Sequence, residues 1–151
     1  MIFPKERHMT SMISAARIAA VMGLPGKVRS LGELSSAVRD GLPKSALKAS
    51  LARVFPEGAE QTSMLYRVIP EATYKRRREH LKTDESERTE RLARVIATAE
   101  YVWDDRAESM RFLTTPHARL EGQRPVEVAL RELGARRVEE LLWKLYYGLA
   151  A

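Results

Sequence analysis

The chain has 151 residues, of which 44% are hydrophobic, and it contains no cysteine. This length suits one compact domain or two small ones, and the apolar fraction is ordinary for a protein that buries a core. The absence of cysteine excludes disulfides, thiolate metal sites and cysteine nucleophiles, and it agrees with a cytoplasmic location.

The stretch MISAARIAAVMGLPG near the N-terminus is apolar but too short to span a bilayer. Basic residues precede it, as in a signal peptide, but Arg17 interrupts the apolar core that such a peptide needs. We therefore prefer an amphipathic helix over residues 10–22. Its partly buried face is expected to contain Ile13, Ala16, Ile18, Ala20 and Val21.

Helical spacing of apolar residues dominates the rest of the chain, whereas the alternation typical of strands is almost absent. The pattern predicts an all-α fold. Glycine and proline mark helix ends in GLPG, in GLP and in FPEG. Helices are expected at about 10–22, 31–40, 44–54, 60–67, 70–80, 84–103, 105–113, 125–131 and 133–147.

The clearest helix is the one expected at 84–103. Thr83 is its predicted N-cap, and the acidic residues DESE follow in the first turn, where the helix dipole favours carboxylates. Apolar residues at helical spacing then predict one buried stripe, made of Leu92, Val95, Ile96, Ala99, Val102 and Trp103.

The later helices also have recognisable ends. Asp105 and Glu108 have the spacing of a capping box, and Pro125 suits a first helical turn. Gly148 stands where a left-handed residue ends the last helix. The buried side of that helix is expected to contain Ala135, Val138, Leu141, Leu142 and Leu145.

The formal charge of +6 lies entirely in the first half of the chain. Residues 1–80 carry 14 Lys and Arg against 7 Asp and Glu, a balance of +7, whereas residues 81–151 carry 12 against 13, a balance of −1. Such an asymmetry suggests two parts with different partners, and the basic part suits a polyanion.

A run of four basic residues, KRRR, lies at positions 75–78. Most charge runs are solvated helix faces, but the preceding residues favour another interpretation. EQTSMLYRV, IP and EATYKRRREH have the layout of a helix-turn-helix, whose second helix enters the major groove. Arg and Lys there bind bases and phosphates. The predicted DNA-binding residues are Thr73, Lys75, Arg76, Arg77 and Arg78.

The turn of this motif departs from the common pattern. A glycine usually provides a positive φ there, and Val68 occupies the corresponding place, where a β-branched residue is unfavourable. Met64 or Leu65 stands where a small alanine is common. We therefore expect a distorted turn or a register shifted by one residue.

The segment IPEATYKRRREHLKTDESERTERLARVIATA resembles the junction of Xre/MbcA/ParS-type antitoxins. Further resemblance follows in RFLTTPHARLEGQRPVEVA and LGARRVEELLWKLYYG, and precedes it in ARIAAVMGLPG and VRDGLPKSAL, so that it covers nearly the whole chain. Departures from the family pattern are Phe112 in place of a common tryptophan, His117 in place of a common asparagine, and Val68 at the turn.

The resemblance implies an all-α protein with two parts. Residues 1–82 would form a helix-turn-helix domain with its motif at about 60–80, and residues 83–151 a toxin-binding domain. The implied partners are a RES-type toxin that consumes NAD, operator DNA and a second copy of the chain. In such pairs the antitoxin's C-terminal end lies at the toxin's active-site cleft, and the complex represses its own promoter.

The C-terminal end itself, LYYGLAA, is apolar and aromatic. Aromatic residues are enriched at interface hot spots, although here they could simply complete the core of the last helix. Together with the resemblance, this predicts a partner-binding end. The predicted toxin-binding residues are Trp143, Tyr146, Tyr147, Gly148 and Leu149.

Catalytic motifs are not recognisable in the sequence. His8, His80 and His117 lack metal-ligand spacing, and there is no phosphate-binding loop or nucleophile motif. We expect no enzyme activity, cofactor, metal or membrane association. One alternative is a stand-alone DNA-binding regulator whose C-terminal domain only dimerises, and a weaker one is an enzyme with an unrecognised site.

Overall fold

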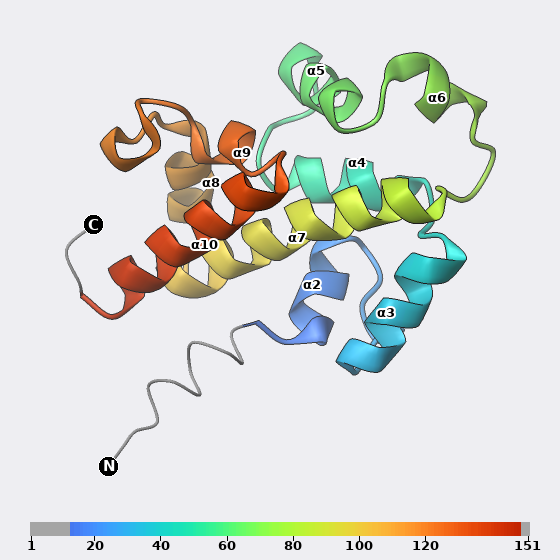
Figure 1. Ribbon diagram of the computed structural model, residues 1–151, viewed down its shortest axis with the longest axis horizontal. Coiled ribbons are helices and arrows are strands. Elements are labelled where there is room, and N and C mark those ends of the chain that lie inside the picture. Colours follow the sequence, from blue (N-terminus) through green and yellow to red (C-terminus); the bar gives the residue numbers. More distant parts are fainter. Residues whose placement is uncertain (1–12, 149–151) are drawn as a thin grey trace.

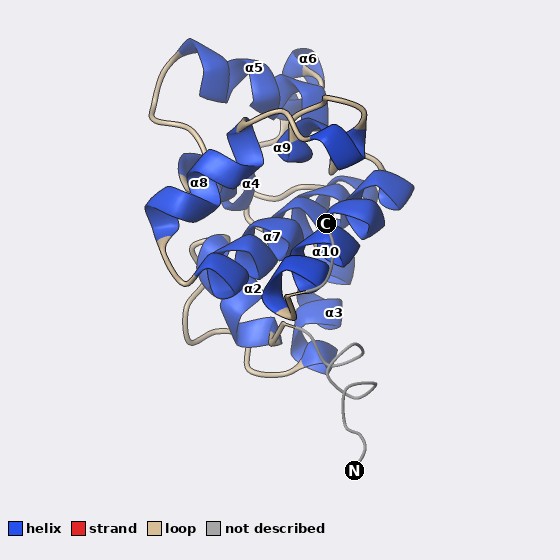
Figure 2. Cartoon of the chain, turned by 90° about the vertical axis from the view of Figure 1, so that its left-hand side faces the viewer, coloured by secondary structure: helices blue, strands red, loops and turns tan. Residues whose placement is uncertain are grey.

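The computed structural model describes residues 13–148, and within this range the chain is helical, as the sequence predicts. Figure 2 shows helices joined by loops, with no strand in the part of the chain that is described. The elements in chain order are α2 (Ala15–Val21), α3 (Leu31–Asp40), α4 (Ser45–Ala52), α5 (Ala59–Val68), α6 (Glu71–Arg76), α7 (Thr83–Trp103), α8 (Arg106–Thr114), the 3₁₀ turn η1 (Ala118–Leu120), α9 (Pro125–Val128) and α10 (Glu132–Tyr146).

Helix α7 runs through the middle of the molecule, and α2, α3, α4, α5, α8 and α10 all pack against it (Figure 1). Because it has neighbours on several sides, its buried surface is wider than one stripe. Leu92, Val95, Ile96 and Ala99 are fully buried, as predicted. Trp103 was wrongly assigned to the buried stripe, since 37% of it is exposed at the end of the helix.

The buried apolar residues form one continuous cluster that extends from α2 to α10. Residues of both the basic first half and the neutral second half contribute to it. The two halves therefore share a core around α7 and hold each other in place.

The expected buried face of the first helix is confirmed in part, because Ile18 and Val21 are buried and Ile13 is half-buried. Ala16 and Ala20 are exposed, whereas Ala15, Ile18 and Ala19 are buried. The described helix begins at Ala15, where the Ser14 hydroxyl accepts a hydrogen bond from the Arg17 amide, and residues 10–12 of the expected helix lie outside the described range. The expected burial of Ala16 and Ala20 was wrong, because Ala15 and Ala19 lie on the buried side of the helix instead.

Two of the predicted helix caps are confirmed, and one lies one residue away from its predicted position. The Asp105 side chain accepts the Glu108 amide at 2.9 Å, and Gly148 has a φ of 70° just after α10. The N-cap of α7 is Lys82, whereas Thr83 is already helical. The Thr83 hydroxyl instead donates to the carbonyl of Arg39 at 2.8 Å, which ties the start of α7 to the end of α3.

Helix α6 is shorter than the expected 70–80 and ends at Arg76. Beyond it the chain is no longer helical and pairs with the loop before α4. The Lys44 amide donates to the Glu79 carbonyl at 2.8 Å, and the Leu81 amide donates to the Leu42 carbonyl at 2.9 Å. These hydrogen bonds use backbone groups that a continued helix would need, and α6 therefore ends in the middle of the basic run. Helix α9 similarly ends at Val128 rather than at residue 131.

Candidate functional site

Helices α5 and α6 are joined by a turn of two residues, Ile69 and Pro70. Ile69 is extended, with φ −133° and ψ 119°, and is completely buried, and Pro70 has φ −52°. Val68 is the last residue of α5 and is also buried. The expected conflict at Val68 was wrong, because this turn requires no residue with positive φ. The Ile69 side chain in the core sets the direction in which α6 leaves.

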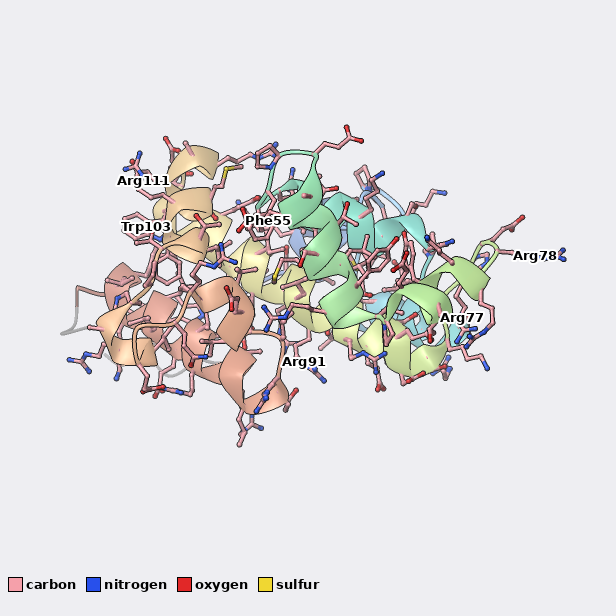
Figure 3. The ribbon with its side chains drawn as sticks, turned by 90° about the horizontal axis from the view of Figure 1, so that it is seen from above. Phe55, Arg77, Arg78, Arg91, Trp103 and Arg111 are labelled. Carbon is pink, nitrogen blue, oxygen red and sulfur yellow. The ribbon has the colours of Figure 1, made fainter. Side chains whose placement is uncertain are left out.

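Most basic side chains at and just after α6 are exposed. Lys75, Arg76 and Arg78 face solvent, and Thr73 is half-buried. Lys75 pairs with Glu71, one turn earlier, at 2.6 Å. Arg78 lies at the outer edge of the molecule, as Figure 3 shows, while Arg77 turns back toward the body. A protruding face of this kind can reach a polyanion without rearrangement of the core.

Arg77 is held by Glu85 in the first turn of α7. Its Nε and Nη2 donate to the two carboxylate oxygens at 2.9 and 2.6 Å, and the side chains are only 15% and 4% exposed. Glu85 also accepts the Lys82 amide at 2.9 Å. The hydrogen bond from Arg77 lowers the pKa of Glu85 to about 2, although burial opposes this. Arg77 is thus less available than its neighbours.

Tyr74, which sequence reasoning did not single out, packs α6 against the loop before α4. Its hydroxyl donates to the Lys44 carbonyl at 3.2 Å, and the Lys44 ammonium lies 4.5 Å from its ring centroid. Tyr66 of α5 meets the same ring edge-on at 6.3 Å. Burial raises the pKa of the Tyr74 hydroxyl. The sequence feature that could have indicated this packing role is a tyrosine within an otherwise polar and basic helix.

At the other end of the molecule, four rings form a C-terminal aromatic cluster, which comprises Tyr101, Trp143, Tyr146 and Tyr147. Trp143 is 6% exposed, with its ring centroid 5.8 Å from that of Tyr101. Tyr146 is 45% exposed, and its hydroxyl lies 3.5 Å from that of Tyr101. The cluster joins the ends of α7 and α10 and presents one aromatic face outward.

Of the predicted toxin-binding residues, the structure brings together Trp143, Tyr146, Tyr147 and Gly148 at the end of α10. Trp143 is mainly a core residue of this end. Leu149 lies outside the described residues. Tyr101, on α7, was missed because it is 45 residues away from Tyr146 in the sequence.

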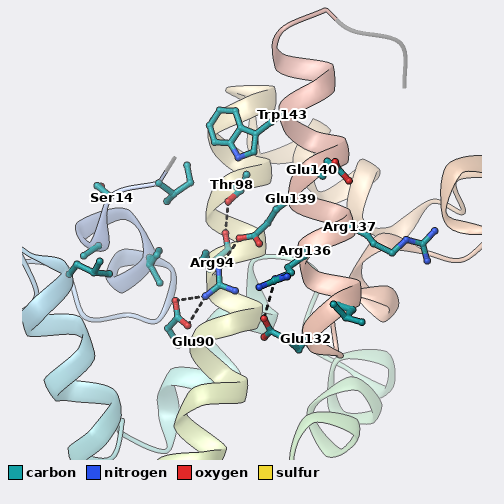
Figure 4. Close-up of a pocket in the computed structure, with 15 residues that line it drawn as sticks. Ser14, Glu90, Arg94, Thr98, Glu132, Arg136, Arg137, Glu139, Glu140 and Trp143 are labelled. Carbon is teal, nitrogen blue, oxygen red and sulfur yellow. Dashed lines mark hydrogen bonds and ion pairs between the residues drawn. The ribbon is translucent and has the colours of Figure 1, made fainter. Parts of the chain in front are cut away.

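A groove of about 1000 Å³ lies between α2, α3, α7 and α10 (Figure 4). Its charged side chains are largely paired with one another. Arg94 donates to Glu90 at 2.9 Å and to Glu139 at 2.7 Å, and burial raises the pKa of Glu90. The exposed rim includes Leu31 and Leu133, which are 75% and 68% exposed. This arrangement resembles a structural ion-pair network more than a catalytic site.

Within 13–148 there is no group of three or more His, Asp or Glu side chains arranged to hold a metal ion. Over that range no helix is both long and apolar enough to cross a membrane.

The exposed basic helix after a short turn, carried on a helical core, defines an all-α protein of the helix-turn-helix class. The model of the antitoxin Xre-like helix-turn-helix domain matches residues 33–94, which include the whole α5–α6 motif. The model of the antitoxin Xre/MbcA/ParS C-terminal toxin-binding domain matches residues 98–148, which include the C-terminal aromatic cluster.

A curated relative agrees with both matches. The chain is 29% identical to a Pseudomonas putida protein named antitoxin Xre over 136 residues, which cover 88% of this chain and 82% of that protein. The chain belongs to the Xre/MbcA/ParS antitoxin family. It is an antitoxin with a helix-turn-helix domain and a toxin-binding domain, and the two matched segments adjoin within α7.

Proposed function

We propose that this antitoxin inhibits a RES-type toxin that consumes NAD, and that it represses its own operon by binding operator DNA. The observation that carries the proposal is the separation of two surfaces on one core. An exposed basic helix lies at one end, within the helix-turn-helix segment, and an outward aromatic face lies at the other, within the toxin-binding segment.

Operator binding is assigned to the α6 surface. Lys75, Arg76 and Arg78 would contact phosphates or base edges, with Thr73 beside them, because these side chains lie on the protruding part of the motif. Helix-turn-helix proteins commonly bind two half-sites about one helical turn apart. We therefore propose a homodimer. A sedimentation measurement that finds only a 17.1 kDa species at micromolar concentration would contradict it.

Toxin inhibition is assigned to the end of α10. Tyr146 and Tyr147 would contact the toxin, with Gly148 and Leu149 at or in its cleft, so that NAD is excluded sterically. The exposed face of Tyr146 supports this, because a large aromatic side chain facing water is typical of an interface anchor. Trp143 would act from beneath, by holding the two tyrosines in place.

The match to a toxin-binding domain favours this function over that of a stand-alone regulator, whose C-terminal half would serve dimerisation alone. A pull-down after co-expression with a RES-type enzyme, if the neighbouring gene encodes one, is the first test. Stable capture is expected, and failure to capture that enzyme would contradict the proposed partner.

The role of the C-terminal end is tested by deleting residues 148–151. The fold should persist, because α10 ends at Tyr146 and its buried residues precede that point. We expect the complex to assemble while NAD consumption by the toxin returns at saturating antitoxin. Full inhibition by the truncated protein would show that the body of the C-terminal half, and not its end, blocks the toxin.

A further inference from the structure

We propose that Arg77 is a positioning residue for DNA binding: its pair with Glu85 fixes the end of α6, and its neighbours Arg76 and Arg78 contact the DNA. This inference rests on the proposed operator binding by α6. It assigns different roles to adjacent arginines that the sequence presents as equivalent.

Helix α6 has no fully buried residue of its own to anchor it. None of its six residues is buried, and an isolated helix of this length is unstable in water. At its N-terminal end, the buried Ile69 fixes the chain. Its orientation therefore depends on the half-buried Tyr74, which packs against Lys44 and Tyr66, and on what holds the C-terminal end, where Arg77 follows the last helical residue.

The pair of Arg77 and Glu85 has a geometry that fixes the end of α6. Arg77 donates two hydrogen bonds to Glu85, at 2.9 and 2.6 Å, and Glu85 belongs to the first turn of the central helix α7. A bidentate pair of this kind fixes angle as well as distance. If Arg77 turned outward to a phosphate, it would leave the carboxylate of Glu85, only 4% exposed, without its charge partner. Such unpaired buried charge is strongly unfavourable.

Arg77 is also held through its backbone. Lys44 donates from Nζ to the backbone carbonyl of Arg77 at 3.0 Å, and the same ammonium lies over the ring of Tyr74. The backbone of Arg77 is thus held from the α4 side, and its side chain from the α7 side. In contrast, Arg76 and Arg78 have no ion pair with any described residue and are exposed.

A positioning role and a direct DNA-contact role for Arg77 make opposite predictions for the variant Glu85→Gln. This change removes a negative charge from beside the basic surface, so simple electrostatics would tighten DNA binding. Loss of positioning would weaken it instead. The direction of the change in DNA affinity, and not its size, therefore distinguishes positioning from direct contact.

The experiment is a salt titration of binding to a DNA fragment that carries the protein's own promoter. The variants are Glu85→Gln, Arg77→Gln, Arg76→Gln and the exchange Arg77→Glu/Glu85→Arg. We expect Glu85→Gln and Arg77→Gln to weaken binding several-fold with unchanged dependence on salt. Arg76→Gln should lower the slope of log K against log salt by roughly one unit. The exchange should recover part of the lost affinity, because the pair re-forms with its partners reversed.

Amide hydrogen exchange in the absence of DNA provides a readout that does not require operator binding. We expect faster exchange over residues 71–77 in Glu85→Gln and in Arg77→Gln, and wild-type exchange in Arg76→Gln. The proposal is overturned if Arg77→Gln lowers the salt slope by about one unit while Glu85→Gln tightens binding, or if exchange over α6 is unchanged in both variants. If wild-type protein does not bind the promoter, operator binding fails, and hydrogen exchange still decides whether Arg77 positions α6.

Discussion

Helices α6 and α7 adjoin in the chain but are stabilised in different ways. Helix α7 has 21 residues, ten of them buried, and it is the element against which most others pack. Helix α6 has six residues and none buried. The apolar contacts of α7 determine its position, whereas α6 is held by the half-buried Tyr74 and by contacts at its ends. A helix that reads DNA needs an exposed surface, so its position must be set by neighbouring residues.

The largest difference between the two helices is expected in their contribution to stability. Replacement of Leu92, which is 1% exposed on α7, by alanine should lower the free energy of unfolding by about 2–5 kcal/mol, because it leaves a cavity in the shared core. Arg76→Ala on α6 should change it by no more than about 0.5 kcal/mol. Urea unfolding of both variants measures this, and a similar loss in both would contradict the comparison.

The same difference explains which elements the sequence predicts well. The limits of α7 and the burial of Leu92 and Val95 follow from apolar spacing, which is a local pattern. The end of α6 does not, because residues 79–81 pair with the loop at 42–44, and no local pattern contains that contact. Trp103 continues the helical spacing of α7 but lies at its last residue, where it packs against Phe112 and stays partly exposed.

For the candidate site, the sequence could indicate a basic surface but not the pairing within it. The acidic first turn of α7 was predicted from the helix dipole, and Glu85 does accept the amide of Lys82. Its pair with Arg77 spans eight residues and crosses from one helix to the next, a spacing that no single element predicts. The role of Tyr74 likewise depends on Lys44, which is 30 residues away.

A second, intermediate effect is expected where the C-terminal helices approach closely. A Cβ atom at Gly134 of α10 would overlap the carbonyl of Val128 in α9, so Gly134→Ala should cost about 1–3 kcal/mol of unfolding free energy. Gly32 in α3 is the matched control, since its Cβ would meet only the Ser30 hydroxyl, at 3.9 Å. Thermal unfolding should show a clear loss for the first and little change for the second, and equal effects would argue against the close approach.

A smaller effect is expected at the junction of α6 and α7, where it depends on pH. The pKa of Glu85 falls from an ordinary value of 4.5 to about 2 in the folded protein. The resulting stability is fully present above about pH 4.5 and is lost progressively as the pH falls toward 2. Burial gives Glu90 the opposite shift, so its contribution favours the folded state as the pH falls.

Thermal unfolding between pH 6 and pH 2 measures this dependence. Glu85→Gln should be less stable than wild type at pH 6, and the difference should diminish toward pH 2, where the Glu85 carboxylate of the folded wild type becomes about half protonated. A difference that stays constant across this range would contradict the shifted pKa of Glu85.

The central claim is that one core carries two surfaces with separate functions, and the double variant Arg76→Ala/Arg78→Ala tests it most directly. Two quantities are measured on the same preparation: the salt dependence of promoter binding, and the inhibition of NAD consumption by the proposed RES-type toxin. We expect the slope of log K against log salt to fall by about two units, one for each lost phosphate contact, while inhibition stays at the wild-type level. Unchanged promoter binding, or loss of both activities together, would contradict the claim.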